Sequence, residues 1–416
     1  MPKGREGEAA KTTQAKEDGM PHIAQNYYQK QNTPLMNSYI HRSNLPTVLV
    51  GSKEDKEFIK SPMNYTGGKY KLLGQLLNNI PDEPDIVVDL FAGGLDFSLN
   101  VNASKVISND IIKELKDLYQ YWQIHDYQYL INELDSRINE LGLSKTNKRA
   151  YNRLVKQYNK QPNSRDFFLL VCYGFNNQIR FSKKNHKFNT SFGKGRSHFT
   201  SNMRENFRKL HKKFKSSDFS FTSQDFRDFD FSELTENSFV YIDSPYTISL
   251  ASYMSGAGEW SYQEDQDLFK ICDELDKRGI KFAMSNVFEN KGLVNQPLIE
   301  WSQKYNVIHL EHTYKNCSYQ RKNKNSKTDE VLITNYVVVN IDEEAGQKDV
   351  VIPSDLLWIN DEVSLELSND KIAEQYSKEP LEKRRVYNYL QTSKEDLGIY
   401  RTFNKDLFIE EYKADS

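Results

Sequence analysis

Cysteine is scarce in this sequence, and long hydrophobic runs are missing. Cys172, Cys272 and Cys317 are odd in number and widely spaced, which excludes a disulfide framework and a zinc-ligand pattern. We therefore expect no metal site and a reducing, cytoplasmic setting. No segment approaches the roughly 18 apolar residues of a membrane span. The opening stretch MPKGREGEAAKTTQAKEDGM lacks the apolar core of a secretion signal, so secretion is not expected.

The net charge of −2 conceals a strong asymmetry along the chain. Residues 141–215 contain 19 lysines and arginines against two acids, a local balance of +17, so the rest of the chain carries −19. A solvated surface normally mixes both signs. A long segment of one sign is typical of contact with a polyanion, because basic side chains neutralise phosphates and release counterions. The sequence therefore predicts a nucleic-acid partner.

Short apolar runs that end on polar residues predict the strands of a sheet. They read DIVVDLFAGG, KVISND, FSFTSQDF, SFVYIDSPY, IKFAMSN, YNVIHLEHTY and DEVLITNYVVV. Helical stretches lie between them, such as QEDQDLFKICDELDKRG, where Leu268, Ile271, Cys272 and Leu275 recur at helical spacing before Gly279. Strands that alternate with helices indicate an α/β fold with a mostly parallel sheet and helices on both faces.

The basic segment interrupts this alternation and reads as an insertion. It begins with the helical stretch NKRAYNRLVKQYNK and continues into a predicted hairpin around KKNHK. We expect a polar, partly disordered N-terminal extension over 1–57, a core formed by 58–115 and 216–340, and an insertion with a role of its own over 116–215. Residues 341–416 form an acidic extension of unknown role, with 18 acids, 10 bases and a helix predicted in KEPLEKRRVYNYL.

Two glycine turns are candidates for a cofactor site. In DLFAGGLDFSLN, Asp89 ends a strand before the Gly93-Gly94 turn, and Asp110 follows 21 residues later at the end of the next strand. The third glycine of the dinucleotide fingerprint is missing, so a simple tight turn remains an alternative. An acid at this place suits the cationic S-adenosylmethionine better than the pyrophosphate of NAD. The second turn, NYTGGK, fits a helix N-terminus equally well.

Four motifs taken together carry a family resemblance. NYTGGK, DLFAGG, SND and DSPY occur in this order, with a basic insertion before the last one. They resemble the DNA adenine methyltransferase (Dam) family over residues 58–340, and FNNQIRF and KFNTSFGK are similar to its recognition hairpin. The resemblance implies a Rossmann-like S-adenosylmethionine-dependent methyltransferase sheet with an inserted, basic target-recognition subdomain. It also implies S-adenosylmethionine as cofactor and double-stranded DNA as partner.

The resemblance assigns cofactor contacts along the whole site. The first motif would border the methionine end, the glycine loop would hold the cofactor, the acid of the second strand would bind the ribose, and an Asp-Phe pair would meet the adenine. In this sequence these residues are Tyr65, Lys69, Asp89, Phe91, Ala92, Gly93, Asp110, Asp225 and Phe226.

The same resemblance assigns catalysis to Asp243, Ser244, Pro245 and Tyr246. The Asp243 carboxylate and the Ser244 carbonyl would accept the N–H groups of an adenine amine, and Tyr246 would stack on the flipped base. The family usually has proline where Ser244 stands, but serine supplies a backbone carbonyl as well. Cytosine-N4 enzymes usually have serine in the first position, so Asp243 favours adenine.

The insertion supplies the predicted DNA contacts. Arg180 aligns with an arginine that contacts bases in the family, and arginine to guanine is the commonest specific contact. Gln178 and Ser191 depart from the family pattern, so the target sequence stays open. The full set of predicted DNA-binding residues is Asn177, Gln178, Arg180, Lys183, Lys184, Lys194 and Arg196.

The sequence thus predicts methyl transfer to N6 of adenine in a short DNA site. A restriction–modification or epigenetic role would follow, with a cognate restriction endonuclease as functional partner. The alternatives are a cytosine-N4 DNA methyltransferase, an adenine RNA methyltransferase, and an inactive homologue that only binds DNA. A NAD-dependent dehydrogenase explains neither the basic segment nor DSPY.

Overall fold

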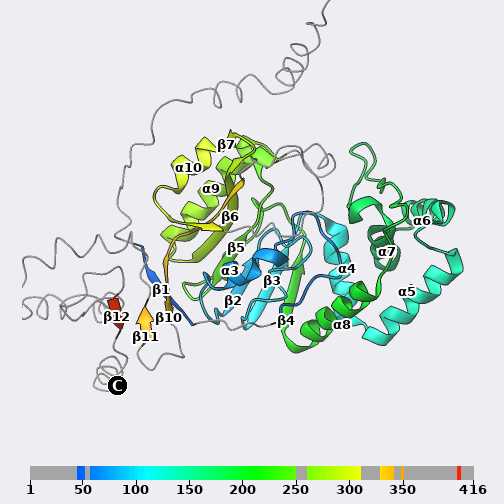
Figure 1. Cartoon of the computed structure of the whole chain (residues 1–416), viewed down its shortest axis with the longest axis horizontal. Helices are drawn as coiled ribbons and strands as arrows, with labels where there is room; N and C mark the ends of the chain where they lie inside the picture. Colours follow the sequence, from blue (N-terminus) through cyan, green and yellow to red (C-terminus); the bar gives the residue numbers. More distant parts are fainter. Residues whose placement is uncertain are drawn as a thin grey trace, which may run out of the picture.

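The computed structural model describes residues 45–51, 57–249, 260–310, 328–341, 348–350 and 401–403 (Figure 1). Most of the two predicted extensions, the helix expected in KEPLEKRRVYNYL, and Cys317 lie outside the described residues. None of the helices in the described part of the chain is both long and apolar enough to cross a membrane.

An eight-stranded sheet forms the centre of the described structure, in the order β4-β3-β2-β5-β6-β9-β8 with β7 paired to β6. The strands are β2 (Ile86–Asp89), β3 (Lys105–Asn109), β4 (Asp218–Thr222), β5 (Phe239–Ile242), β6 (Lys281–Asn290), β7 (Leu293–Val294), β8 (Asn306–Leu310) and β9 (Thr328–Thr334). Strands β4, β3, β2, β5 and β6 are parallel, and β9 runs antiparallel to both β6 and β8. The strand order reverses between β2 and β5, where doubly wound sheets bind their ligands.

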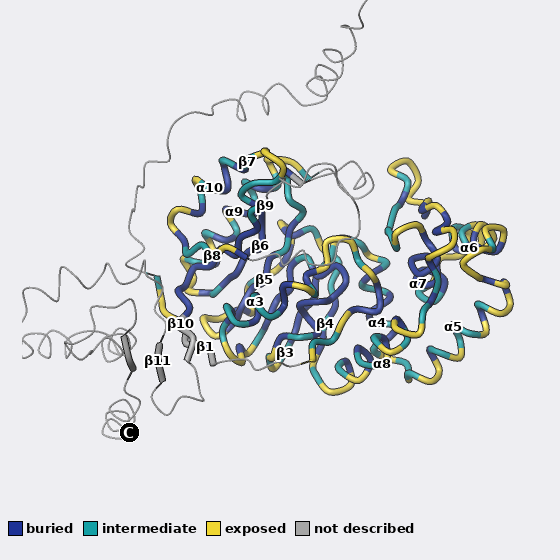
Figure 2. The backbone as a smooth tube through the Cα atoms, in the orientation of Figure 1, coloured by how far each residue is buried: buried dark blue, intermediate teal, exposed yellow. Residues whose placement is uncertain are grey.

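The central strands are mainly apolar because helices cover both faces of the sheet. Val87 of β2 belongs to one hydrophobic core, and its neighbour Val88 belongs to a second core on the other face. Strand β5 is buried along its whole length, and the tube in Figure 2 is dark blue at the centre of the sheet. The predicted α/β architecture is confirmed.

Eight α-helices and three short 3-10 turns are described along with the sheet. They are η2 (Tyr70–Leu72), α3 (Leu73–Leu77), α4 (Lys113–Ile124), α5 (Tyr127–Leu141), α6 (Lys148–Lys160), α7 (Ser164–Tyr173), η3 (Phe175–Asn177), α8 (Ser201–Ser216), η4 (Thr247–Ser249), α9 (Tyr262–Lys277) and α10 (Gln296–Ser302). Helix α9 begins with a capping box between Ser261 and Glu264, which satisfies free backbone N–H groups. It ends before Gly279, whose φ of 72° suits glycine.

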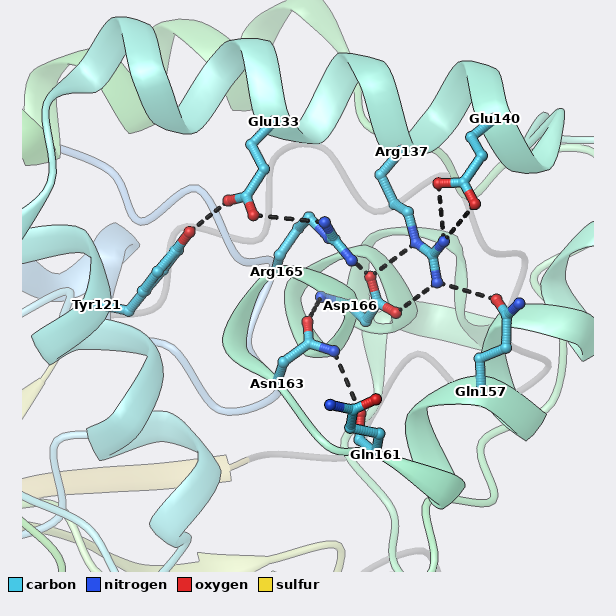
Figure 3. A network of polar contacts seen from close by, with 9 residues as sticks. All are labelled: Tyr121, Glu133, Arg137, Glu140, Gln157, Gln161, Asn163, Arg165 and Asp166. Carbon is cyan, nitrogen blue, oxygen red and sulfur yellow. Dashed lines mark hydrogen bonds and ion pairs between the residues drawn. The ribbon is translucent and has the colours of Figure 1, made fainter.

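The chain between β3 and β4, which contains the basic segment 141–215, folds largely into helices. Helices α4 and α8 pack against β4, while α5, α6 and α7 lie beside the sheet (Figure 1). A polar network ties them together, as Figure 3 shows. Asp166 on α7 receives two hydrogen bonds from Arg137 of α5, at 3.0 and 2.8 Å, and one from Arg165 at 2.9 Å. Arg137 also donates to Gln157 of α6 at 2.9 Å.

A hairpin follows α7 and carries the KKNHK turn. Asn176 and Asn177 have φ values of 53° and 54°, a left-handed conformation that asparagine tolerates better than most residues. Beyond them Phe181 and Phe188 form an antiparallel bridge. The Ser182 N–H donates to the Lys187 carbonyl at 2.8 Å. The predicted hairpin is therefore present.

One strand prediction was wrong: DEVLITNYVVV forms two strands. Strand β9 ends at Thr334, and β10 (Val337–Ile341) pairs in parallel with β1 (Thr47–Gly51). The Asn335 side chain lies between them. It accepts from the Phe282 N–H at 2.8 Å and donates to the Ile280 carbonyl at 3.0 Å, so the backbone leaves the sheet there. A second small pair joins β11 (Lys348–Val350) to β12 (Arg401–Phe403).

Candidate active site

A cavity of about 330 Å³ lies at the carboxyl ends of β2, β3, β4 and β5. It occupies the point where the strand order reverses. Every residue that the sequence assigned to the cofactor or to catalysis lines it. These are Tyr65, Lys69, Asp89, Phe91, Ala92, Gly93, Asp110, Asp225, Phe226, Asp243, Ser244, Pro245 and Tyr246. The fold thus brings residues from five separate parts of the chain into one space.

The glycine loop after β2 packs against the ring of Tyr65. Gly93 has a φ of 44°, and a Cβ atom on it would lie 2.7 Å from Tyr65 Cε1. A Cβ atom on Gly94 would lie 2.7 Å from Tyr65 Cβ. Both glycines are needed because NYTGGK and DLFAGG are in direct contact, a reason that the sequence did not disclose.

Two buried carboxyl groups face the cavity from β2 and the end of β3. Asp89 is 2% exposed and accepts a hydrogen bond from the Ser98 hydroxyl at 2.6 Å. Burial raises the pKa of Asp89 to about 7. Asp110 accepts from the N–H groups of Gly93 at 3.0 Å and Ile112 at 2.9 Å, and burial raises its pKa to about 6. A cationic ligand would favour the ionised form of both groups.

An aromatic wall closes the cavity beyond the glycine loop. Phe226 lies 5.6 Å from Phe91 and 5.3 Å from Trp260, measured between ring centroids. Asp225 forms a bidentate ion pair with Arg227, at 2.8 Å for both contacts. Trp260 was missed by the sequence analysis. Trp260 lies outside the motifs and directly before Ser261, the N-cap of α9. Little in its sequence position therefore indicates a role.

Asp243, Lys69, Tyr246 and Glu330 form one polar cluster at the end of β5. Lys69 Nζ lies 2.8 Å from Asp243 Oδ1 and 3.5 Å from Glu330 Oε1. The Tyr246 hydroxyl donates to the same two oxygens, at 3.0 and 3.2 Å. Lys69 Nζ also lies 4.9 Å from the Tyr246 ring centroid. Glu330 was missed as well, although an acid within the apolar run EVLIT is a signal.

The cluster shifts the protonation of its own members. Burial raises the pKa of Asp243, and the Lys69 ammonium only partly opposes that rise. Burial lowers the pKa of Lys69, but the Asp243 and Glu330 carboxylates more than offset it, so the net shift is upward. Burial and the same two acids hold the pKa of Tyr246 well above its usual value. Lys69 is therefore a cation and Tyr246 a hydrogen-bond donor at neutral pH.

Ser244, which stands where the Dam family usually has proline, is 3% exposed. Its buried hydroxyl has no hydrogen-bond partner among the described residues. The hydroxyl therefore does not anchor the side chain there, and the backbone of Ser244 is the part that the predicted role uses.

The predicted DNA-binding residues divide into two sets. Lys183, Lys184, Lys194 and Arg196 are exposed. Gln178 and Arg180 are half-buried, and the Arg180 Nε is buried with no partner in the described structure.

Asn177 has a local structural task. Its amide donates to the carbonyls of Val171 at 3.0 Å and Cys172 at 3.3 Å, at the end of α7. Its oxygen accepts from Asn64, next to Tyr65, at 3.5 Å. This contact places the base of the hairpin beside the rim of the cavity.

The sheet order and the cavity at its reversal point define a Rossmann-like α/β protein with a nucleotide-type site. Residues 65–316 match the family described as D12 class N6 adenine-specific DNA methyltransferase. The match covers more than half of the chain, which therefore belongs to this family. The resemblance and the methyltransferase fold expected from the motifs are confirmed.

Relatives with known names support the same assignment. Modification methylase StsI of Streptococcus sanguinis is 42% identical over 298 residues, which cover 70% of this chain and 45% of the relative. Type II methyltransferase M.FokI of Planomicrobium okeanokoites is 38% identical over 313 residues, covering 74% and 47%. A DNA adenine methylase of Salmonella typhi is 26% identical over 293 residues, covering 67% and 95%. The chain spans about half the length of the first two relatives.

Proposed function

We propose that this protein transfers a methyl group from S-adenosylmethionine to N6 of an adenine in double-stranded DNA. The observation that carries the proposal is the position of Asp243. Its carboxylate stands at the end of β5 in the same cavity as the glycine loop and the two buried acids. Family membership supports the reaction, and the names of the relatives support a role in modification.

The cavity suits S-adenosylmethionine in charge and shape. Asp89 and Asp110 offer buried carboxyls to the cationic and ribose parts, and Phe226 with Trp260 offers flat surfaces to the adenine. When bound, this cofactor supplies an activated methyl group on a sulfonium. The protein contributes mainly positioning and electrostatics, since the leaving group is already part of the cofactor.

The residues of β5 and its loop would activate the target amine. Its lone pair is delocalised into the adenine ring, which makes the amine a poor nucleophile. Hydrogen bonds from its N–H groups to the Asp243 carboxylate and the Ser244 carbonyl would draw the nitrogen towards a tetrahedral shape. The new N–C bond would form as the S–C bond breaks, with the thioether S-adenosylhomocysteine as leaving group. The nitrogen would release one proton, by way of the Asp243 carboxylate, to water.

Tyr246 would hold the flipped base. Lys69 lies over its ring at 4.9 Å from the centroid, so the base would stack on the opposite ring face. Stacking of this kind offsets part of the cost of unstacking a base from the duplex.

The insertion would bind the duplex around the target base. Lys183, Lys184, Lys194 and Arg196 are exposed and suited to phosphate contacts. Arg180 would contact base edges, and its Nε has no partner among the described residues. Asn177 would position the hairpin, because its amide already donates to the Val171 carbonyl of α7. A cognate restriction endonuclease would be a functional partner, and we propose a cytoplasmic location for this activity.

The proposal is tested by methyl transfer from labelled S-adenosylmethionine to DNA that lacks adenine methylation. We expect transfer by the wild type, and its loss in Asp243→Ala by at least about a hundredfold, the usual cost of removing a group that stabilises the transition state. Asp230→Ala is the matched control, since Asp230 is exposed and does not line the cavity. Equal activity of wild type and Asp243→Ala would refute the assigned role.

A further inference from the structure

Glu330 lies beside the proposed reaction centre without belonging to any of the motifs. It is 6% exposed on β9, and the cavity-lining residues do not include it. Its Oε1 lies 3.5 Å from Lys69 Nζ and accepts a hydrogen bond from the Tyr246 hydroxyl at 3.2 Å. Glu330 therefore reaches the cavity only through other side chains.

Both of these partners of Glu330 are also partners of Asp243. Lys69 Nζ lies 2.8 Å from Asp243 Oδ1, and the Tyr246 hydroxyl donates to that oxygen at 3.0 Å. Lys69 Nζ and the Tyr246 hydroxyl thus each lie within reach of both carboxylates. With both acids ionised and Lys69 protonated, these four side chains together carry a net charge of −1, whereas the Lys69–Asp243 pair alone would be neutral.

This excess negative charge matches the charge changes of the proposed reaction. The target nitrogen becomes positive as its bond to the methyl group forms, before it loses a proton. A fixed negative charge in a buried site stabilises such a developing cation more strongly than the same charge would in water. An ammonium that is shared with Glu330 also neutralises Asp243 less, so Asp243 remains a better acceptor for the amine N–H.

We propose that Glu330 is a positioning residue for methyl transfer, an inference that rests on the proposed function. Its carboxylate contacts the Lys69 ammonium and the Tyr246 hydroxyl and holds both side chains in place. Because it shares the Lys69 ammonium with Asp243, the Asp243 carboxylate remains incompletely neutralised. Glu330 touches neither the base nor the cofactor.

The direction of the pH effect follows from the charges around Asp243. The Glu330 carboxylate raises the pKa of both Asp243 and Lys69. Loss of this charge lowers both pKa values, so Asp243 ionises at a lower pH. The other titratable groups that interact with Asp243 are Tyr65, Asp89, Asp96 and Tyr241. None of these four is replaced in a Glu330 variant, although the Glu330 carboxylate also raises the pKa of Tyr241.

The test is the single-turnover rate of methyl transfer across pH for the full chain carrying Glu330→Gln. We expect the plateau rate to fall about ten- to a hundredfold, as for other groups that act through their neighbours. The acidic limb of the profile should move to lower pH. Glu330→Asp keeps the charge and should retain the wild-type acidic limb with a partly restored rate.

Asp329→Asn is the matched control. Asp329 precedes Glu330 on β9, and its Oδ1 lies 2.8 Å from Nδ1 of His309 on β8. The Asp329→Asn substitution therefore removes the same charge from the same strand. Its rate should stay within about twofold of wild type, as for most exposed positions. A loss equal to that of Glu330→Gln would show a general charge effect and overturn the inference.

The remaining outcomes separate this inference from the proposed function. If the wild type transfers no methyl group, the proposed function fails first. An active wild type with a Glu330→Gln rate and pH profile that match it overturns the role of Glu330 alone. If Glu330→Gln does not fold, Glu330→Asp decides, because a shifted acidic limb in that variant contradicts the inference.

Discussion

The protonation state of Asp89 links the pH of the solution to the affinity of the cavity for a cation. The pKa of Asp89 is about 7 in the folded protein, whereas in an unfolded chain the same carboxyl group loses its proton near pH 4. The folded state therefore binds the extra proton between these values, and Asp89 makes the protein less stable as pH rises through this window. A bound cation would reverse that preference by favouring the ionised form.

Cofactor binding should consequently tighten as pH rises from about 5.5 to 7. One released proton gives a limiting change of about tenfold in the dissociation constant per pH unit. Isothermal titration calorimetry with S-adenosylmethionine measures this directly. Asp89→Asn should bind more weakly and keep only the dependence below about pH 6 that Asp110 contributes. Asp230→Asn should behave as wild type, and a wild-type affinity independent of pH would refute the assignment.

At the scale of elements, the buried acid of Figure 3 holds the inserted helices together. Asp166 is 2% exposed and is paired with both Arg137 and Arg165. Its removal leaves two guanidinium groups without their shared partner. Loss of one member of a buried charge pair typically costs about 3–5 kcal/mol.

Asp166→Ala should therefore lower the free energy of unfolding by that amount, measured by urea denaturation with circular dichroism. Glu140→Ala is the control, because Glu140 binds the same Arg137 while its side chain is 61% exposed. Its expected cost is below about 1 kcal/mol. Cofactor affinity should survive in both variants, since the cavity contains no residue of α5, α6 or α7. Equal destabilisation by the two variants would contradict the account.

The hairpin after α7 should contribute to DNA affinity through salt-dependent contacts. Replacing both Lys183 and Lys184 with alanine should reduce the slope of log affinity against log salt by about two, near 0.9 for each phosphate contact. Fluorescence anisotropy with duplex DNA at several salt concentrations gives this slope. The double variant Lys270→Ala/Lys277→Ala removes the same charge from exposed positions of α9. Identical slopes for the two double variants would rule out the hairpin as the contact.

At the scale of the whole molecule, the sequence predicted the sheet and the motifs at its strand ends. Asp89, Asp110 and Asp243 end buried strands, and parallel strands place their carboxyl ends together. Glu330 and Trp260 could not be predicted in the same way. Each reaches the site from outside the motifs, so only the packing of β9 and the start of α9 brings it there. The break at Asn335 also depends on tertiary hydrogen bonds to Phe282 and Ile280.

The chain unites a methyltransferase sheet with a basic helical insertion, and a contact between Asn64 and Asn177 joins the cavity rim to the base of the hairpin. This arrangement would present a flipped base to the cofactor while the insertion holds the duplex. The central claim is the identity of the product, an adenine methylated at N6.

The most direct measurement is nucleoside mass spectrometry of DNA treated with the protein and trideuteromethyl S-adenosylmethionine. The account predicts labelled N6-methyladenine, confined to one short sequence motif and absent with Asp243→Ala. Labelled N4-methylcytosine, or no labelled nucleoside despite tight binding of cofactor and DNA, would contradict it.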